Sequence, residues 1–286
     1  MKAVLRHLLA GACVAAATAA SAAGLTPANY VEVGDTIVDM LDTSSLAFST
    51  MLLGLDDRPR VMRVAFTSPT ARVQPFNAPC PGGGSIHGSV ADRDGSGDVS
   101  VRDRFVTVFE ACRIDDELIS GSSEFVVAGH RIDNGVETTE LEFRFRQLGN
   151  DAMRWTGPAR ATLKSDARTG SDQYTVSYQD LAVTRAARSY RWNFTLTVQR
   201  PPLGDHTARI DGSLTLDHDR LRLAQDEPFV IGARGVPRAG QLTATDADGN
   251  RLEVEAASRR YRYRFFTRGN QGAAPDSSSR SRLHGG

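Results

Sequence analysis

The chain has 286 residues, with 34 basic and 34 acidic side chains and a formal net charge of zero. This balance gives no support for a nucleic acid or an anionic membrane as the partner, because both favour a strongly basic surface. The apolar fraction of 40% is ordinary for a globular protein, and no apolar run is long enough to cross a bilayer as a helix. We therefore expect a globular protein without a transmembrane helix.

The first 23 residues have the features of a secretory signal peptide. Lys2 and Arg6 precede a small, apolar stretch over residues 8–20, and both Ala20-Ser21-Ala22 and Ser21-Ala22-Ala23 fit the small-x-small rule of signal peptidase. We predict a signal peptide over 1–23 and export of the rest. The periplasm is the expected location, with the cell surface or the medium as alternatives.

Residues 24–60 carry the one helix-like pattern of the chain. Their apolar side chains recur at three- and four-residue steps, which indicates a helix lying on or beside a sheet. Thr36 or Asp35 is the expected cap of its first turn, and Gly54 is the expected stop. Because Thr43-Ser44-Ser45 weakens the middle, one helix and two short helices both fit. The apolar positions are Ile37, Met40, Leu41, Phe48, Met51, Leu52 and Leu55.

From Val61 onward the apolar period changes to two, which is typical of antiparallel strands with one buried and one wet face. Turn residues separate these runs at Asn134-Gly135, Thr169-Gly170 and Asp248-Gly249. The fold class is therefore mainly β: an antiparallel meander, a sandwich or an open barrel of about a dozen strands. Apolar faces are predicted for Leu141, Phe143 and Phe145, for Tyr190, Trp192, Phe194, Leu196 and Val198, and for Tyr261, Tyr263 and Phe265.

Pro201-Pro202 marks a candidate boundary within the β region. We expect a main β domain over 61–200 and a smaller C-terminal β unit over 203–267. Residues 268–286 contain one Leu and no aromatic side chain, so they cannot bury enough apolar surface to offset their ordering entropy. This tail is predicted to be disordered.

Three cysteines occur, and removal of the leader would take Cys13 with it. A lipoprotein anchored through Cys13 is an alternative, although Ala10-Gly11-Ala12 is a poor lipidation box. The remaining pair, Cys80 and Cys112, is interpreted as one disulfide of an exported protein. Two free buried thiols are the competing interpretation.

The two cysteines bracket the acidic loop DRDGSGDVSVRD, which has the ligand spacing of a twelve-residue calcium loop. A hard cation needs six or more oxygens, and alternate residues of a curled loop provide them. The flanking residues have a strand pattern, so we expect a hairpin and no helix pair. A solvated hairpin that binds no ion is the alternative. The predicted Ca²⁺ ligands are Asp92, Asp94, Ser96, Asp98 and Asp103.

No catalytic motif is present, and we predict no enzyme activity. Neither a nucleophile elbow nor a phosphate loop occurs. Glu140 with Glu142 shares a wet strand face, as a glycosidase pair would, but charged residues on such a face are commonly only solvated. Five aromatic residues could form a sugar-binding platform or, at period two, part of the core. They are Trp155, Tyr174, Tyr178, Tyr190 and Trp192.

The order Cys, Gly-rich strand, DxDGxG-type loop, apolar strand and Cys resembles a group of uncharacterised exported proteins of Gram-negative bacteria. The resemblance covers residues 78–130 and implies export, a β-rich fold and one disulfide, but no activity. The leading hypothesis is a non-catalytic exported β protein of unspecified role with a structural Ca²⁺. A carbohydrate- or ligand-binding β domain with a glycan or cell-envelope partner comes second, and a small outer-membrane barrel third.

Overall fold

The computed structural model describes residues 24–52, 73–97, 100–114, 117–185, 188–232, 237–257, 260–269 and 277–279, and for 42–52 and 277–279 it describes the backbone alone. The predicted leader (1–23), the strand expected to begin at Val61 and the expected helix stop at Gly54 lie outside these residues.

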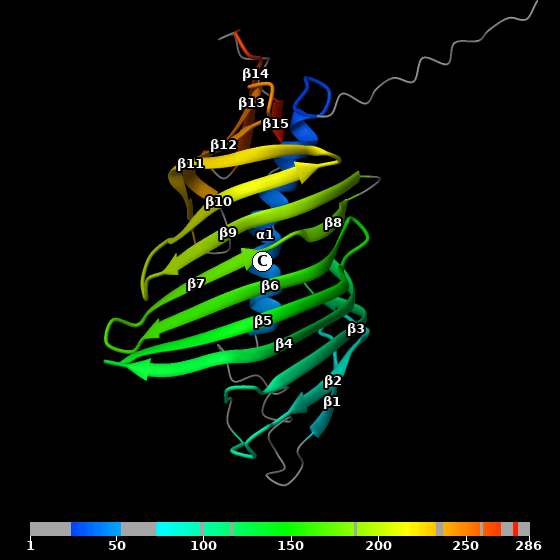
Figure 1. Cartoon of the computed structure of the whole chain (residues 1–286), viewed down its shortest axis with the longest axis vertical. Coiled ribbons are helices and arrows are strands. Elements are labelled where there is room, and N and C mark those ends of the chain that lie inside the picture. The colour runs from blue at the N-terminus through cyan, green and yellow to red at the C-terminus, as the bar shows by residue number, and fades with distance from the viewer. Residues whose placement is uncertain are drawn as a thin grey trace, which may run out of the picture.

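The described chain is one antiparallel β-meander with a single helix (Figure 1). Strands follow one another in sequence order, except that β7 and β8 both lie between β6 and β9. The mainly β prediction is confirmed, with the meander as the form observed. The elements are α1 (Tyr30–Leu52), β1 (Val73–Pro79), β2 (Ser85–Ala91), β3 (Arg104–Ile114), β4 (Glu117–Asp133), β5 (Val136–Gly149), β6 (Met153–Asp166), β7 (Ser171–Tyr178), β8 (Leu181–Arg185), β9 (Arg188–Arg200), β10 (His206–Leu216), β11 (Asp219–Ile231), β12 (Pro237–Thr245), β13 (Arg251–Ala257), β14 (Arg260–Phe266) and β15 (Ser277–Ser279).

The sheet is open, with β1 and β15 at the two ends of the strand order. It continues across Pro201-Pro202, because β9 and β10 pair without a break from Thr207 and Gln199 to Leu216 and Tyr190. The domain boundary at these prolines stays a prediction. Within the segment predicted to be disordered, β15 pairs with Tyr261–Tyr263 of β14.

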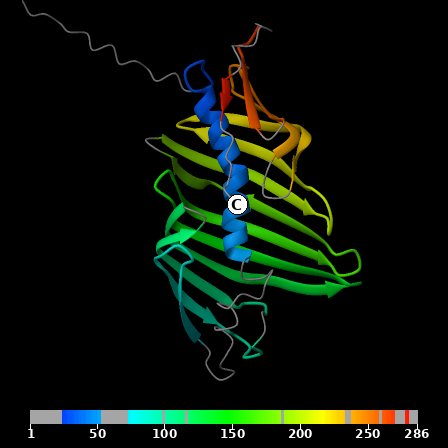
Figure 2. The same ribbon diagram turned by 180° about the vertical axis from the view of Figure 1, so that it is seen from behind.

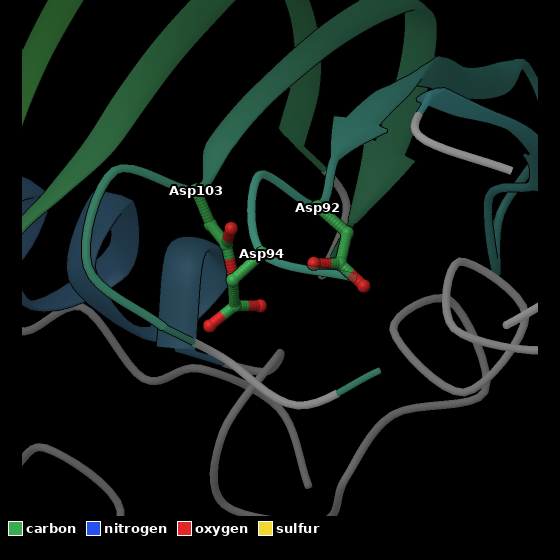
Figure 3. A group of neighbouring side chains, drawn as sticks. All are labelled: Asp92, Asp94 and Asp103. Carbon is green, nitrogen blue, oxygen red and sulfur yellow. The ribbon is translucent and has the colours of Figure 1, made fainter. Parts of the chain in front are cut away.

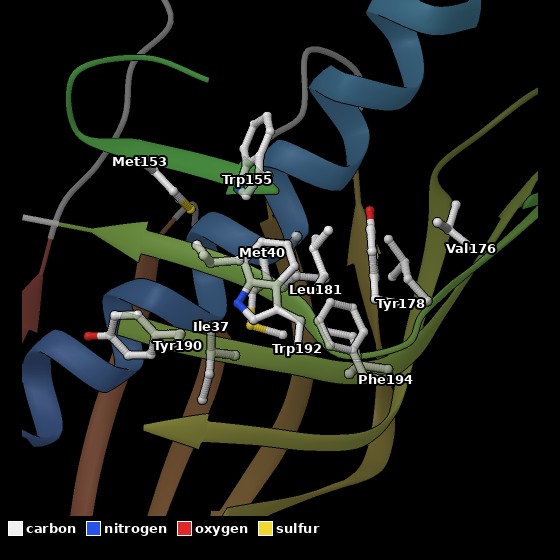
Figure 4. Packing of buried hydrophobic residues seen from close by; sticks show 14 of the residues in the cluster. Ile37, Met40, Met153, Trp155, Val176, Tyr178, Leu181, Tyr190, Trp192 and Phe194 are labelled. Atoms are coloured by element: carbon white, nitrogen blue, oxygen red, sulfur yellow. The ribbon is translucent and has the colours of Figure 1, made fainter. Parts of the chain in front are cut away.

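Period-two alternation places the predicted apolar faces in the core. Phe143 and Phe145 of β5, Trp192 of β9 and Tyr263 of β14 are all buried, and the residues that alternate with them are exposed or half-buried. Figure 4 shows how side chains of β6, β8 and β9 converge with Ile37 and Met40 of the helix. The core is therefore the inner face of the sheet together with one face of α1.

The helix begins earlier than predicted. The Thr26 hydroxyl accepts the N–H of Asn29 at 3.2 Å, and the Asn29 side chain accepts the N–H of Thr26 at 2.8 Å, which is a reciprocal cap. The expected capping role of Thr36 is wrong: Thr36 lies inside the helix, fully buried, and its hydroxyl donates to the Glu32 carbonyl at 2.8 Å. A polar residue is tolerated there because this bond satisfies its hydroxyl.

The sheet curves around α1 (Figures 1 and 2). The helix contacts both β9 and β14, which are five places apart in the strand order. At β14 the approach requires glycine, because a methyl group on Gly34 would lie 2.9 Å from the ring of Tyr263. At β9 the hydroxyl of Tyr190 donates to Glu32 at 3.0 Å, and burial raises the pKa of Tyr190 to about 12, so it remains a donor. Among the described residues no helix is long and apolar enough to span a membrane.

A nearly buried ion pair fixes the middle of the helix to the sheet. Arg185 of β8 lies 2.9 Å from the Asp39 carboxylate, with side-chain exposures of 14% and 10%. The same guanidinium donates to the Glu32 carbonyl and the Thr36 hydroxyl at 3.3 Å each. Removing one partner of such a pair costs far more than breaking an exposed pair, because the other charge stays buried.

We predict that Asp39→Ala lowers the free energy of unfolding by about 3 kcal/mol, since Arg185 keeps its burial and loses its carboxylate. Asp151→Ala is the matched control, because it breaks the exposed Arg154–Asp151 pair and should change stability by no more than about 0.5 kcal/mol. Urea unfolding of both variants measures the difference. Equal losses would contradict the structural role of the buried pair.

Candidate functional site

The predicted site lies on the β2–β3 hairpin. A disulfide joins Cys80 to Cys112 with a Cα–Cα distance of 5.4 Å, at the end of the hairpin opposite the acidic loop. Gly84 is required beside this bridge, because any Cβ there would overlap the carbonyl oxygen of Ala111. The expectation of a disulfide-stapled hairpin, with strands rather than helices on both sides of the loop, is confirmed.

The loop between β2 and β3 is curled by residues with a left-handed backbone. Gly95 and Gly97 have φ angles of 72° and 76°, a region that glycine adopts without steric cost. The end of the loop is tied to β4: Arg102 N–H donates to the Val127 carbonyl at 2.8 Å, and Val127 N–H donates to the Asp103 carbonyl at 3.0 Å. The loop is therefore held from both the hairpin and its neighbouring strand.

Two of the loop carboxylates are buried and organise its backbone. Asp92 accepts the N–H groups of Gly95 at 2.7 Å and Gly97 at 2.9 Å. Asp103, with none of its surface exposed, accepts those of Arg93 at 2.9 Å and Ser100 at 2.7 Å. These bonds fix the positions of the two carboxylates and leave each oxygen a second lone pair for a further ligand.

Asp94 differs because it is exposed at the surface of the loop. The backbone N–H of Ser96 donates to its carboxylate at 2.9 Å, and this bond is the main reason why the pKa of Asp94 is lowered to about 2. The carboxylate is consequently ionised at any physiological pH. A metal ion would meet no competing proton at this ligand.

The fold brings three of the five predicted ligands together (Figure 3). One carboxylate oxygen from each member of the aspartate triad (Asp92, Asp94 and Asp103) lies within 4.8 Å of the others. Ser96 is exposed and contacts Asp94 through its N–H at 2.9 Å, and Asp98 lies outside the described residues. Within the described ranges no salt bridge neutralises the triad.

The aspartate triad can hold a metal ion, and its oxygens are the ligand type that hard cations prefer. The same backbone bonds also suit the alternative interpretation, because a hairpin can use carboxylates only to cap N–H groups. The two interpretations differ in the net charge of the loop. Without a cation the three close carboxylates repel one another, and a bound cation would offset this repulsion. The cluster supplies fewer protein oxygens than a full calcium loop, so water would complete the coordination.

The five aromatic residues considered as a sugar platform are mainly in the core. Trp155, Tyr178, Tyr190 and Trp192 are each at most 8% exposed, and only Tyr174 is half-buried. The core interpretation of these residues is therefore the one the structure supports. Buried rings on the inner face cannot stack on a glycan at the surface.

The solvent-facing side of the sheet has a cavity that the sequence did not predict. A cavity of about 450 Å³ lies over β3 to β7, on the side opposite the buried Phe143 and Phe145 rings. Four arginines and two glutamates line it, giving a net charge of +2. Arg104 donates to Glu124 at 2.8 Å, and this bond lowers the pKa of Glu124. The charged lining residues are Arg104, Arg144, Arg146, Arg160, Glu124 and Glu142.

Because Leu141, Phe143 and Phe145 form the predicted apolar face of this strand, alternation places Glu142, Arg144 and Arg146 on the opposite face. It does not predict their convergence with Arg104 and Arg160, which depends on strand register. Glu142 is paired with Arg160 at 3.2 Å, and Glu140 with Arg131 at 3.1 Å. The acidic pair considered for glycoside hydrolysis is thus engaged by arginines.

Comparison with protein-family models, curated proteins and solved structures finds no match to this chain. Functional conclusions therefore depend on the geometry of the aspartate triad and of the arginine-lined cavity.

We predict that the Asp94 carboxylate stabilises the folded protein above its ordinary pKa of 3.8 and that this contribution is lost as the pH falls through about 2. A lowered pKa means that the ionised form prefers the folded state, so protonation removes the benefit. The difference in melting temperature between the protein and Asp94→Asn, measured in a metal chelator, should shrink from pH 5 to pH 2. A constant difference would show that the local hydrogen bonds do not act through the charge.

Proposed function

We propose that the protein is a non-catalytic exported β protein in which the aspartate triad binds a structural Ca²⁺. The observation that carries the proposal is the convergence of three carboxylates without a neutralising side chain among the described residues. Export is supported by the leader-like sequence of 1–23 and by the Cys80–Cys112 disulfide, which persists in oxidising compartments.

Calcium suits this loop better than magnesium does. Ca²⁺ accepts six to eight oxygens in flexible geometry, whereas Mg²⁺ demands near-ideal octahedral coordination and dehydrates reluctantly. The loop supplies an irregular oxygen set from a curled backbone, with room for water. Because its two flanks are strands joined by a disulfide, the ion would stiffen the turn and could not open a pair of helices.

We predict that 5 mM CaCl₂ raises the free energy of unfolding by about 1–2 kcal/mol relative to chelator, for a dissociation constant of about 10⁻⁴–10⁻³ M. The corresponding rise in melting temperature is roughly 2–8 °C. Asp94→Asn should abolish the rise, because it removes a ligand charge and keeps an oxygen acceptor for the Ser96 N–H. Equimolar MgCl₂ should act more weakly.

Asp248→Asn is the matched control, since Asp248 lies in another exposed D-x-D-G turn, between β12 and β13. It should keep the full Ca²⁺ response. Substituting Asp92 or Asp103 is less informative, because each also holds two backbone N–H groups. The absence of a Ca²⁺ response, or the same response in Asp94→Asn, would refute the site.

The arginine-lined cavity favours a second function, binding of an acidic glycan. Arg144 and Arg146 form no ion pair shorter than 4.0 Å with any described residue, although their charge helps to lower the pKa of Glu124. Guanidinium groups bind carboxylates and sulfates through paired N–H donors. The open, polar hollow can therefore hold an acidic sugar at the surface, where the buried aromatic side chains cannot.

We predict that an oligogalacturonate binds the protein more tightly than a neutral galactose oligomer of the same length, and that binding weakens as salt is raised. The double variant Arg144→Ser/Arg146→Ser should lose at least about tenfold in affinity by calorimetry, the equivalent of roughly 1.4 kcal/mol. Arg262→Ser, which removes an exposed arginine of β14, is the control and should bind normally. Equal affinity for the two oligomers would exclude this function.

A further inference from the structure

The segment that directly follows the predicted leader is held by hydrogen bonds to the helix start and to the β12–β13 turn. Gly24 and Leu25 are both buried, and Leu25 N–H donates to a carboxylate oxygen of Asp246 at 3.0 Å. The Asn29 side chain donates to the Gly24 carbonyl at 2.7 Å, and that of Asn250 to the Leu25 carbonyl at 3.3 Å. Segments near a chain end remain poorly ordered unless they are tied down, so these three hydrogen bonds need a reason.

Two carboxylates face Gly24 from neighbouring turns of the sheet. A substituent at the Cβ position of Gly24 would lie 3.1 Å from an oxygen of Asp246 and 3.2 Å from an oxygen of Asp219. Asp246 is only 8% exposed, and neither aspartate forms a salt bridge with a described residue. A buried carboxylate without a cation is costly, even when backbone N–H groups bind it.

We infer that proteolytic removal of the leader after Ala23 creates the missing cation, the α-ammonium group of Gly24, and that Asp219 and Asp246 bind it. Water adds across the Ala23–Gly24 peptide bond during cleavage by the export peptidase. Ala23 keeps the new carboxylate, and Gly24 keeps the amine, which takes up a proton at neutral pH because its ordinary pKa is about 8. This inference uses the predicted leader and is independent of calcium binding.

The distances from the Cβ position of Gly24 to the two carboxylates suit an ammonium nitrogen better than a carbon atom. Once the peptide bond before Gly24 is cut, its amino group can rotate about the Cα–C bond. Rotation to the next tetrahedral position on Cα places the nitrogen where a Cβ atom would lie. The Cα–N bond of about 1.46 Å is close in length to a Cα–Cβ bond. The nitrogen would then lie close to 3.1 and 3.2 Å from the two carboxylate oxygens, within the range of about 2.7–3.2 Å for N–H···O bonds. The other two positions on Cα carry only hydrogen, so no side chain opposes the turn.

The choice between the two signal-peptidase sites follows from this arrangement. Cleavage after Ala22 would leave Ala23 at the end, and its ammonium would be one residue removed from the aspartates. Cleavage after Ala23 puts the charge where Asp219 and Asp246 already point. Removal of the leader would thereby complete the contact between the N-terminal segment, the β10–β11 turn and the β12–β13 turn.

The first test is the intact mass of the protein recovered after export from the full chain. The expected N-terminus is Gly24, and a retained leader or a start at Ala23 would overturn the inference.

The second test is a double-mutant cycle on two purified forms, one starting at Gly24 and one starting at Ser21, which lacks an ammonium at Gly24. Asp219→Asn should lower the melting temperature of the Gly24 form by roughly 2–4 °C and leave that of the Ser21 form unchanged. Asp219 suits this test because its side chain is only half-buried and forms no hydrogen bond or ion pair with a described side chain. The variant should therefore fold.

Asp217→Asn is the matched control, since it removes the same charge from an exposed position two residues earlier on the same turn. Its effect should not depend on where the chain starts. As a measurement that needs no substitution, Nα-acetylation of the Gly24 form should lower its melting temperature by the same amount as Asp219→Asn. Equal effects of Asp219→Asn in the two forms, or no effect of acetylation, would refute the capture of the ammonium.

Discussion

Burial of the inner face of the sheet under α1 is the interaction on which the rest of the structure depends. The strands of the described chain bury one long apolar face, and an open sheet must cover that face to be stable in water. The helix covers part of it with Ile37 and Met40 and is fastened by polar contacts of Glu32, Asp35 and Asp39 with β8, β9 and β14. Because these contacts reach strands far apart in the order, they also set the curvature of the sheet.

The arginine-lined cavity and the proposed N-terminal contact depend on the arrangement of the strands and the helix, whereas the aspartate triad depends mainly on its own hairpin. The aspartate triad lies where the β2–β3 loop is tied to β4, and the arginine-lined cavity lies on the outer side of the same part of the sheet. The first residues before the helix reach the β12–β13 turn because α1 contacts β13 and β14. Loosening of the helix would therefore also weaken the contacts of Leu25 with Asp246 and Asn250 in that turn.

Local sequence predicted the strands well and the helix start poorly. Alternation works for β5, β9 and β14 because each strand has one core face, so Phe143, Trp192 and Tyr263 could be assigned to it without knowledge of their neighbours. The cap was misplaced because Thr36 has a favoured capping side chain, and only burial against Arg185 shows that it belongs to the helix interior. Its hydroxyl was compatible with both positions.

The sequence by itself determined that the protein is mainly β, that Cys80 and Cys112 pair, and that Asp92, Asp94 and Asp103 have the spacing of ion ligands. The first depends on the two-residue period of apolar side chains, the second on the even number of cysteines after the predicted leader, and the third on the spacing of aspartates within one loop. All three are local properties of the chain. Only the tertiary structure brought Arg104 beside Arg144 and Arg160, and Gly24 beside Asp219 and Asp246. Such groupings are set by the register between strands and by the curvature around α1, and no local pattern specifies either.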